Sequence, residues 1–413
     1  MSGCEKWSPA TWPPGCWGSS AVPSSARWGL TKFAGPAKGR SGSRASKSAM
    51  NDPFAVDPEP FAFHDTLPPD ATGSTATVLG LDIGGANIKA ATSDGQAAAV
   101  RFPMWLTPKR LLDELVSLAA GLPRCPVWAV TMTGEMADSF ATRVEGVLRL
   151  VEVTAVAAKR AGVTELSFYH VEGRFVPAEV ATTEPLAIAS ANWHAMAAWV
   201  VRQIDAPSLL IDIGGTTTDI IPVDPTTGVA TRSRTDFDRL AAGELVYVGG
   251  ERTPVCSLVD SLPLGSRNVP VMREVFGTTD DCRLVLGFCA EDAEDKQTSD
   301  GRPRTMAHAK ARLARMIGRD GDDLTTTEVR EMARVTLAAA TRRLIEAIAQ
   351  QPTTHADRWI LSGHAAQAFL PGLRKAYPLA RVRSLSDQVG QAGSRVGPAL
   401  ACAQLRESTG RFR

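Results

Sequence analysis

The chain has 413 residues, of which 44% are apolar and 22% are charged, and its formal net charge is +1. These values are ordinary for a globular protein large enough for two cores, and the near-zero charge gives no argument for a nucleic-acid partner. The seven cysteines contain no CxxC pair, and no apolar stretch is long and uncharged enough to predict a membrane span. We therefore expect a cytoplasmic protein with free thiols and with no nucleic-acid or membrane partner.

Residues 1–76 differ in composition from the rest of the chain. They are dense in Pro, Gly, Ser and Trp and show no helical or strand period. Such a composition cannot bury enough apolar surface to offset the entropy that is lost on ordering. We predict that 1–76 is disordered, or that residues 1–49 are a misassigned extension ahead of a true start at Met50.

The first part of the remaining chain alternates strands and helices. The stretch "VLGLDIGGANIKAA" at 78–91 reads as an apolar strand, an Asp-Ile-Gly-Gly turn and a second strand. A helix is predicted over 107–123, with Thr107 as its N-cap, because a Thr hydroxyl can accept from the first free amides of a helix. An apolar strand follows at 127–132, and residues 166–177 predict a pair of strands.

The second part repeats the unusual turn. "SLLIDIGGTTTDIIPV" at 208–223 is again strand, Asp-Ile-Gly-Gly and strand. A helix is predicted over 325–350, where Thr325 and a Glu three residues later form a capping box. "RWILSGHAAQAFLPGL" at 358–373 is a third strand that runs into a glycine. This alternation predicts an α/β fold with mixed sheets.

The Asp-x-Gly-Gly turn suggests phosphate chemistry. Successive glycines permit a tight turn whose exposed amides suit an anion. An Asp at the end of the preceding strand can hold Mg²⁺, usually through water. One such turn is more often an ordinary hairpin, but two copies between apolar strands favour a phosphate clamp.

These stretches resemble the phosphate-binding hairpins of the actin, sugar-kinase and Hsp70 superfamily, with 361–364 matching its nucleoside corner. "LIDIGGTTTDI" is similar to the hydantoinase A and oxoprolinase branch. The stretches 131–147, 243–258 and 290–303 resemble a sub-branch of tetrahydromethanopterin-linked C1-transfer proteins. That sub-branch is similar to the archaeal aminomethylfuran–tyramine ether synthases of methanofuran biosynthesis.

The resemblance implies a two-lobed actin- and hexokinase-like (ribonuclease H-like) α/β fold in which two phosphate-binding hairpins face a central cleft. We expect lobe I at 77–206 and lobe II at 207–361. A C-terminal helical segment at 362–413 is expected to close the cleft and return to lobe I.

The implied reaction is a transfer that condenses an aminomethylfuran diphosphate with γ-glutamyltyramine, giving an aryl ether and diphosphate in support of methanofuran- and tetrahydromethanopterin-linked formaldehyde oxidation. Mg²⁺ is the expected cofactor. ATP belongs only to the alternatives, which are a hydantoinase- or oxoprolinase-type hydrolase, a small-molecule kinase and an actin-like nucleotide switch. The oligomeric state is left open, with a homodimer as one option.

The resemblance also assigns roles to residues. Asp82 and Asp212 are expected to be catalytic and to hold the metal, and Glu135 to act as base toward the phenol. Arg252 is expected to bind the glutamyl carboxylate. The predicted phosphate- and substrate-binding residues are Gly84, Gly85, Asn87, Lys89, Gly214, Gly215, Thr216, Thr217, Thr218, Asp219, Arg252, Ser362 and Gly363.

Several of these positions have ordinary alternatives. Lys89 and Arg252 also fit solvated surface positions, and Glu135 also fits a carboxylate at a helix N-terminus. The acidic stretch 290–303 reads either as a solvated loop or as a lid that brings Asp295 and Asp300 near the cleft.

Overall fold

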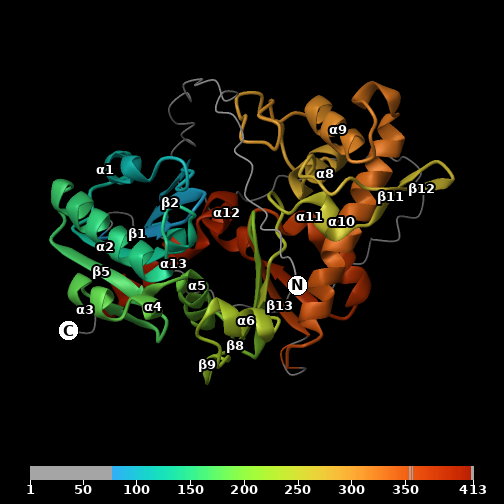
Figure 1. Ribbon diagram of the computed structural model, residues 1–413. Helices are drawn as coiled ribbons and strands as arrows, with labels where there is room; N and C mark the ends of the chain where they lie inside the picture. Colours follow the sequence, from blue (N-terminus) through green and yellow to red (C-terminus); the bar gives the residue numbers. More distant parts are fainter. Residues whose placement is uncertain (1–76, 353–354, 356, 411–413) are drawn as a thin grey trace, which may run out of the picture.

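The computed structural model describes residues 77–352, 355 and 357–410. The predictions for 1–76 lie outside the described residues. The described part forms two lobes, each built on its own mixed sheet (Figure 1). This is the two-lobed, actin- and hexokinase-like α/β arrangement that the sequence predicted.

The sheet of the first lobe has the strand order β3-β2-β1-β4-β5-β6. β1 pairs antiparallel with β2 and parallel with β4, so the first Asp-Ile-Gly-Gly turn joins a hairpin at the centre of the sheet. The strands are β1 (Val78–Ile83), β2 (Asn87–Thr92), β3 (Ala97–Arg101), β4 (Val127–Met132), β5 (Glu165–His170) and β6 (Arg174–Val176). The helices are η1 (Pro108–Arg110), α1 (Leu111–Ala120), η2 (Gly134–Met136), α2 (Arg143–Arg160), α3 (Ala178–Thr183), α4 (Pro185–Ile188) and α5 (Asn192–Val201).

The predicted N-cap of the first helix is wrong. The helix opens with the short 3-10 turn η1 before α1, and Thr107 makes no side-chain cap. Its hydroxyl instead donates to the carbonyl of Pro103 at 3.4 Å. The hydroxyl is therefore turned back along the chain, away from the helix amides.

The sheet of the second lobe has the order β10-β8-β7-β13-β14, with β9 beside β8. β7 pairs antiparallel with β8 and parallel with β13, which repeats the arrangement around β1. Its strands are β7 (Ser208–Ile213), β8 (Thr218–Asp224), β9 (Gly228–Val229), β10 (Leu245–Val246), β13 (Arg358–Ser362) and β14 (Arg381–Ser384).

The remaining elements are further helices and one separate hairpin, of which α8, α9, α10, α11, β11 and β12 build the right-hand part of Figure 1. The long helix α10 carries the predicted capping box, with both of its hydrogen bonds present. These elements are α6 (Asp236–Ala241), α7 (Val255–Leu258), β11 (Ser261–Leu264), β12 (Arg267–Pro270), α8 (Thr279–Leu286), α9 (Met306–Arg315), η3 (Gly321–Asp323), α10 (Thr326–Ile348), α11 (Ala366–Ala376), α12 (Leu385–Arg395) and α13 (Gly397–Gly410).

The C-terminal segment is not wholly helical, because Arg381–Ser384 pairs in parallel with β13 as the strand β14. Helix α13 then crosses to the first lobe and packs on β1. Gly80 permits this contact, since a Cβ there would collide with the carbonyl of Ala399. One core cluster includes residues of both sheets, such as Ala129 and Leu210, together with α5 and α13. The two lobes are therefore joined by shared apolar packing.

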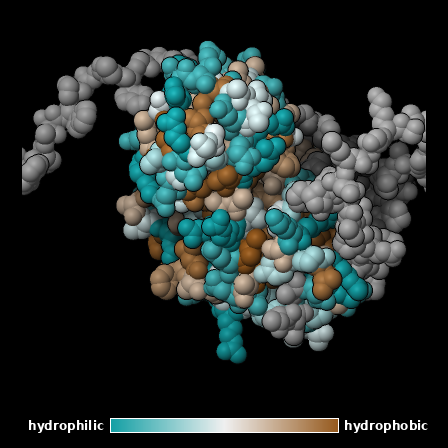
Figure 2. Space-filling model, turned by 90° about the vertical axis from the view of Figure 1, so that its right-hand side faces the viewer, coloured by the Kyte–Doolittle hydropathy of each residue, from teal (hydrophilic) through white to brown (hydrophobic). Residues whose placement is uncertain are grey.

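The helices and the cysteines of the described residues show neither a membrane-spanning segment nor a disulfide. On the face seen in Figure 2, hydrophobic side chains form small areas separated by hydrophilic ones. No helix within the described residues is both long and apolar enough to cross a membrane. The five cysteines among them are free thiols.

Candidate active site

The two Asp-Ile-Gly-Gly turns have the same internal hydrogen bond. The amide of Gly84 donates to the carbonyl of Asn87 at 2.9 Å, and the amide of Gly214 donates to the carbonyl of Thr217 at 2.9 Å. These two amides are held inside their turns and do not face a ligand, which corrects that part of the prediction. The amides of Gly85, Gly215 and Thr216 donate to no described residue, and they stay the predicted anion donors.

The second glycine of each turn faces different surroundings. A Cβ at Gly85 would meet nothing within 4 Å, so the first turn presents an open backbone surface. A Cβ at Gly215 would lie 2.7 Å from Oε2 of Glu251, so this carboxylate lies against the α-carbon of Gly215. The two turns share the same backbone hydrogen bond, but only the first has open space beside its second glycine.

Acidic side chains from both hairpins lie in one electrostatic neighbourhood. Asp82 is buried, and its Oδ2 lies 3.3 Å from Nζ of Lys89 across the first hairpin. Burial, followed by the carboxylates of Asp219 and Asp82, raises the pKa of Asp212 to about 6, and this value already includes the opposing effects of Lys89 and of a hydrogen bond with Ser362. The predicted residues Asp82, Lys89, Asp212 and Asp219 are thus brought together across the two lobes.

The donor set of this neighbourhood fits a magnesium ion. Oδ1 of Asp82 is buried and has no hydrogen-bond partner, and the like charges near Asp212 favour a bound cation. Within the described part of the chain, no three His, Cys, Asp or Glu side chains converge on one point. Mg²⁺ is commonly held by one or two carboxylates, water and substrate phosphates. Asp82 and Asp212 match that pattern.

Asp219 is partly held by the protein. It forms an ion pair with Arg239, whose side chain is buried and whose guanidinium also lies 4.3 Å from the centre of the Trp193 ring. Asp219 therefore contributes negative charge near Asp212 but already has a cationic partner. Asp219 lies near the candidate metal ligands Asp82 and Asp212, but its pairing with Arg239 leaves it outside that pair of ligands.

Among the threonines of the second turn, Thr218 was predicted to bind phosphate, but its side chain points into the protein interior. Its side chain is fully buried, and its hydroxyl donates to the carbonyl of Val248 at 2.7 Å. Successive residues of a strand point to opposite faces, so Asp219 points away from Thr218. Thr216, Thr217 and Asn87 are all partly exposed at the turns.

Glu135 lies directly behind the first hairpin. Its side chain is 1% exposed, and its Oε1 accepts from the hydroxyl of Ser190 at 2.7 Å. Its Oε2 has no hydrogen-bond partner, and burial raises the pKa of its carboxyl group to about 7. Gly146 of α2 packs on its backbone, because a Cβ there would lie 2.7 Å from Cα of Glu135. The group is tuned for proton transfer but is closed off from a substrate.

The third strand-to-glycine corner completes the neighbourhood. Ser362 pairs in register with Asp212, and Gly363 has a φ of +86°. A Cβ on Gly363 would collide with the carbonyl of Ile213 and would lie 2.8 Å from Oδ1 of Asp212. Only glycine fits this corner without strain. The next residue, His364, hydrogen-bonds through Nε2 to Oε1 of Glu251 at 2.8 Å.

His364 belongs to the predicted nucleoside corner 361–364, but neither it nor Glu251 was among the predicted site residues. Both residues directly follow a glycine, in the stretches "LSGH" and "VGGERTP". The amides of Gly250 and Glu251 donate to the carbonyls of Gly214 and Gly215 at 2.9 and 2.8 Å, which fixes the Glu251 backbone on the second turn. A carboxylate after two glycines and a histidine after a glycine were the available signals, but nothing in the sequence showed that they meet.

The acidic stretch 290–303 contacts the first lobe. Asp295 makes two bonds to Arg101, at 2.8 Å to Nη1 and 2.7 Å to Nη2. Asp300 instead pairs with the buried Arg312 inside the second lobe. The lid alternative is thus supported for Asp295, and Asp300 has a role within the lobe.

Arg252 lies at the same boundary. Its side chain is exposed, and its guanidinium carbon lies 5.0 Å from the centre of the Trp105 ring of the first lobe. Its role toward a carboxylate stays a prediction.

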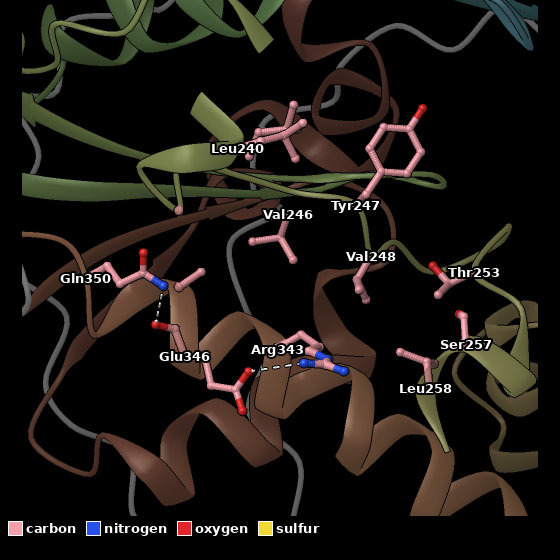
Figure 3. A pocket seen from close by; sticks show the side chains of 13 residues that line it. Leu240, Val246, Tyr247, Val248, Thr253, Ser257, Leu258, Arg343, Glu346 and Gln350 are labelled. Carbon is pink, nitrogen blue, oxygen red and sulfur yellow. Dashed lines mark hydrogen bonds and ion pairs between the residues drawn. The ribbon is translucent and has the colours of Figure 1, made fainter. Parts of the chain in front are cut away.

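A separate pocket of about 380 Å³ lies between β10 and α10 (Figure 3). Leu240 and Tyr247 stand on one side of it, and Arg343, Glu346 and Gln350 on the helix side. None of the predicted site residues lines it. It adjoins the loop that supports the second turn, but the acidic neighbourhood lies elsewhere.

Two proteins similar in sequence to this chain have the same name. The chain is 29% identical over 336 residues, covering 79% of this chain and 97% of the relative, to the "(4-{4-[2-(gamma-L-glutamylamino)ethyl]phenoxymethyl}furan-2-yl)methanamine synthase" of Methanocaldococcus jannaschii. It is 34% identical over 132 residues to the protein of the same name from Methanococcus vannielii, covering 32% of this chain and 59% of that one.

The chain is also similar to solved structures and matches a family model. The activator of the 2-hydroxyisocaproyl-CoA dehydratase from Clostridium difficile with bound ADPNP aligns with 81% of this chain and 98% of its own, at 12% identity and a TM-score of 0.39. The family model described as Hydantoinase/oxoprolinase matches residues 127–402. This match spans most of the described chain and includes the second turn and the glycine corner. The chain belongs to the hydantoinase/oxoprolinase family.

Proposed function

We propose that this protein is a transferase of methanofuran biosynthesis that joins an aminomethylfuran diphosphate to the phenol oxygen of γ-glutamyltyramine and releases diphosphate. The name of the archaeal relatives, which the chain matches over nearly their full length in one case, supports this choice. The observation that carries it is the meeting of Asp82, Lys89 and Asp212, from two facing hairpins, in one neighbourhood suited to a diphosphate.

The chemistry asks the protein for electrostatics more than for covalent steps. A furfuryl carbon can carry positive charge because the furan oxygen donates electron density to it. The barrier then depends on how well the departing diphosphate is stabilised. The free amides of Gly85, Gly215 and Thr216 and the ammonium of Lys89 would bind its oxygens. A Mg²⁺ ion held by Asp82 and Asp212 would neutralise part of the phosphate charge.

The two lobes would bind the partners from opposite sides. The first turn is open at Gly85, which gives the diphosphate access. Arg252 stands exposed at the lobe boundary, where it would attract the glutamyl carboxylate. The contact of Arg101 with Asp295 would hold the acidic stretch over the cleft and limit the entry of water, which competes with the phenol for the furfuryl carbon.

The family name favours a second candidate, an ATP-dependent hydrolase of a cyclic amide. The test therefore runs both reactions. Purified protein with Mg²⁺ is incubated with the furan diphosphate and γ-glutamyltyramine, and the ether is sought by mass spectrometry. In parallel, ATP hydrolysis is followed with oxoproline and with hydantoin. Ether formation without ATP supports the proposal, and ATP turnover that depends on the ring substrate, without ether, would overturn it.

A further inference from the structure

We infer that His364, oriented by Glu251, is the catalytic base that takes the proton from the attacking phenol. The inference deepens the proposed function and rests on it. It assigns the base to a pair that joins the glycine corner after β13 to the loop on the second turn. It therefore replaces Glu135 in that role.

The pair has the geometry of an oriented imidazole. Nε2 of His364 lies 2.8 Å from Oε1 of Glu251, and the carboxylate can only accept, so Nε2 carries the hydrogen. Nδ1 then holds the lone pair in the neutral ring. No described residue hydrogen-bonds to Nδ1, and the His364 side chain is 22% exposed. A carboxylate on one ring nitrogen and an accessible lone pair on the other is how proteins prepare a base for a hydroxyl nucleophile.

The pair also stands where the proposed reaction takes place. Oε2 of Glu251 would lie 2.7 Å from a Cβ on Gly215, so the carboxylate touches the second phosphate turn. On the other side, the backbone of Gly363 reaches Asp212, whose Oδ1 would lie 2.8 Å from a Cβ there. His364 therefore directly follows the residue whose backbone approaches the Asp212 carboxylate. This places it beside the predicted diphosphate site.

The charges around the pair suit a phenol. Nη2 of Arg283 donates to the carbonyl of His364 at 3.4 Å, and Nη1 donates to the carbonyl of Gly250 at 3.1 Å. Arg395 also acts electrostatically on His364, and Arg101 and Arg304 interact electrostatically with Glu251. Burial together with Arg395 and Arg283 lowers the pKa of His364, against the effect of Glu251, and this direction favours the neutral ring. Arg283 and Arg395 would add positive charge near the phenol oxygen as negative charge develops on it.

The step balances as one displacement. The phenol O–H proton passes to Nδ1 of His364, and the oxygen's electron pair forms the bond to the furfuryl methylene carbon. The bond from that carbon to the diphosphate oxygen breaks, and its electron pair leaves with the diphosphate. The imidazolium, stabilised by Glu251, returns its proton to solvent. No oxidant, reductant or further reactant is needed.

Glu135 is the rival base, and its position is less suitable. Its carboxyl group has a pKa near 7, but its side chain is 1% exposed and lies between α2 and the first turn. A phenol could reach it only if α2 or the turn moved. His364 needs no such movement.

The test varies the acidity of the phenol. Single-turnover rates are measured for the wild type and for His364→Gln and Glu135→Gln, with γ-glutamyltyramine and with a ring-fluorinated analogue that is largely ionised at the assay pH. We expect His364→Gln to lose about 10²- to 10⁴-fold with the ordinary phenol and to recover most of that loss with the fluorinated one. An acidic phenol needs no base, whereas a purely structural defect would slow both substrates alike.

A loss in His364→Gln below threefold, or an equal loss with both phenols, would overturn the inference. So would rescue by the fluorinated phenol in Glu135→Gln instead. Glu251→Gln is the second variant, because it keeps a hydrogen-bond acceptor and removes the charge. It should move the acid limb of the kcat/KM profile to lower pH, since the carboxylate raises the pKa of the ring; an unmoved limb contradicts the pairing.

Failure of the proposed function looks different. In that case the wild type itself makes no ether from either phenol, and the inference falls with it. Binding of inorganic diphosphate with Mg²⁺, measured by calorimetry, separates damage to the fold from loss of the base. His364→Gln should bind diphosphate within about twofold of the wild type, and a loss of binding as large as the loss of rate would refute a role limited to the phenol proton.

Discussion

The polar residues in and around the two hairpins fall into two groups, those that the protein already satisfies and those that it leaves without a partner. Thr218 and Asp219 belong to the first, since the Thr218 hydroxyl donates to the carbonyl of Val248 and Asp219 forms an ion pair with Arg239. Oδ1 of Asp82 and Oε2 of Glu135 belong to the second. A buried polar atom without a partner is costly and needs an explanation, and a ligand or a proton supplies one.

Glu135 makes the stability of the protein depend on pH. Its folded-state pKa is about 7, above its ordinary value. Folding therefore favours the protonated form, and this contribution is full at low pH and is lost as the pH rises through 7. Glu135→Gln should be stabilised relative to wild type by about 1–3 kcal/mol at pH 8 and show no such gain at pH 4.5. Thermal unfolding at the two pH values measures it, and a pH-independent difference would contradict the burial argument.

Asp212 should be needed for binding as well as for turnover. Asp212→Asn removes the charge that would hold Mg²⁺, so diphosphate should bind at least about tenfold more weakly in the presence of Mg²⁺ and nearly unchanged in its absence. Calorimetric titration with inorganic diphosphate gives both numbers. Asp322→Asn, at an exposed position in η3, is the matched control and should bind like wild type. Equal weakening with and without Mg²⁺ would argue against a metal at Asp212.

At the scale of elements, the two hairpins are what the sequence predicts best. Their strands, their turns and the capping box of α10 depend on neighbours within a few residues, so local patterns reveal them. The Thr107 cap was wrong because its hydroxyl donates to a competing acceptor, the carbonyl of Pro103 four residues earlier in the chain. The strand β14 was missed because "RVRS" is short and only half-buried at the edge of its sheet.

The candidate site was predictable only in part, for a related reason. Asp82, Lys89 and Asp212 follow from the hairpins, and the structure brings them together. His364 and Glu251 are 113 positions apart, and Arg101 and Asp295 are 194 apart. Contacts of that kind come from how the lobes pack, and no local pattern of charge or hydrophobicity carries them.

The two glycines of the first turn should differ in a direct test. A Cβ on Gly84 would lie 2.7 Å from the carbonyl of Asn87, whereas a Cβ on Gly85 has open space. Gly84→Ala should therefore destabilise the fold by about 1–3 kcal/mol, and Gly85→Ala by less than about 0.5 kcal/mol. Gly85→Ala should still weaken diphosphate binding, because its methyl group covers the anion-facing surface. Unfolding and calorimetry on both variants check this; normal binding by Gly85→Ala would remove the first turn from the site.

The pair of Arg101 and Asp295 should hold the acidic stretch against the first lobe. Both side chains are mostly buried and bond in a two-point geometry, so a double-mutant cycle with Arg101→Ala and Asp295→Ala should give a coupling of about 1–3 kcal/mol. Arg101→Ala should also speed proteolytic cleavage within 290–303. A coupling near zero with unchanged cleavage would show that the stretch is held by other contacts.

At the scale of the whole molecule, the two sheets share one core through α5 and α13. The hairpins sit at the inner ends of β1 and β7, so a movement of one lobe about this core changes the distance between the two turns. The acidic stretch ties the lobes together at a second point. The molecule thus combines a shared apolar core with a polar contact between the two lobes.

The central claim is that the phenol oxygen displaces diphosphate from the furfuryl carbon. It is tested most directly with γ-glutamyltyramine whose phenol oxygen is ¹⁸O. Purified protein, Mg²⁺ and the furan diphosphate are added, and the product is analysed by mass spectrometry. The account predicts an ether that retains all of the ¹⁸O and one diphosphate released for each ether formed. Product without the label, or diphosphate released without ether, would contradict it.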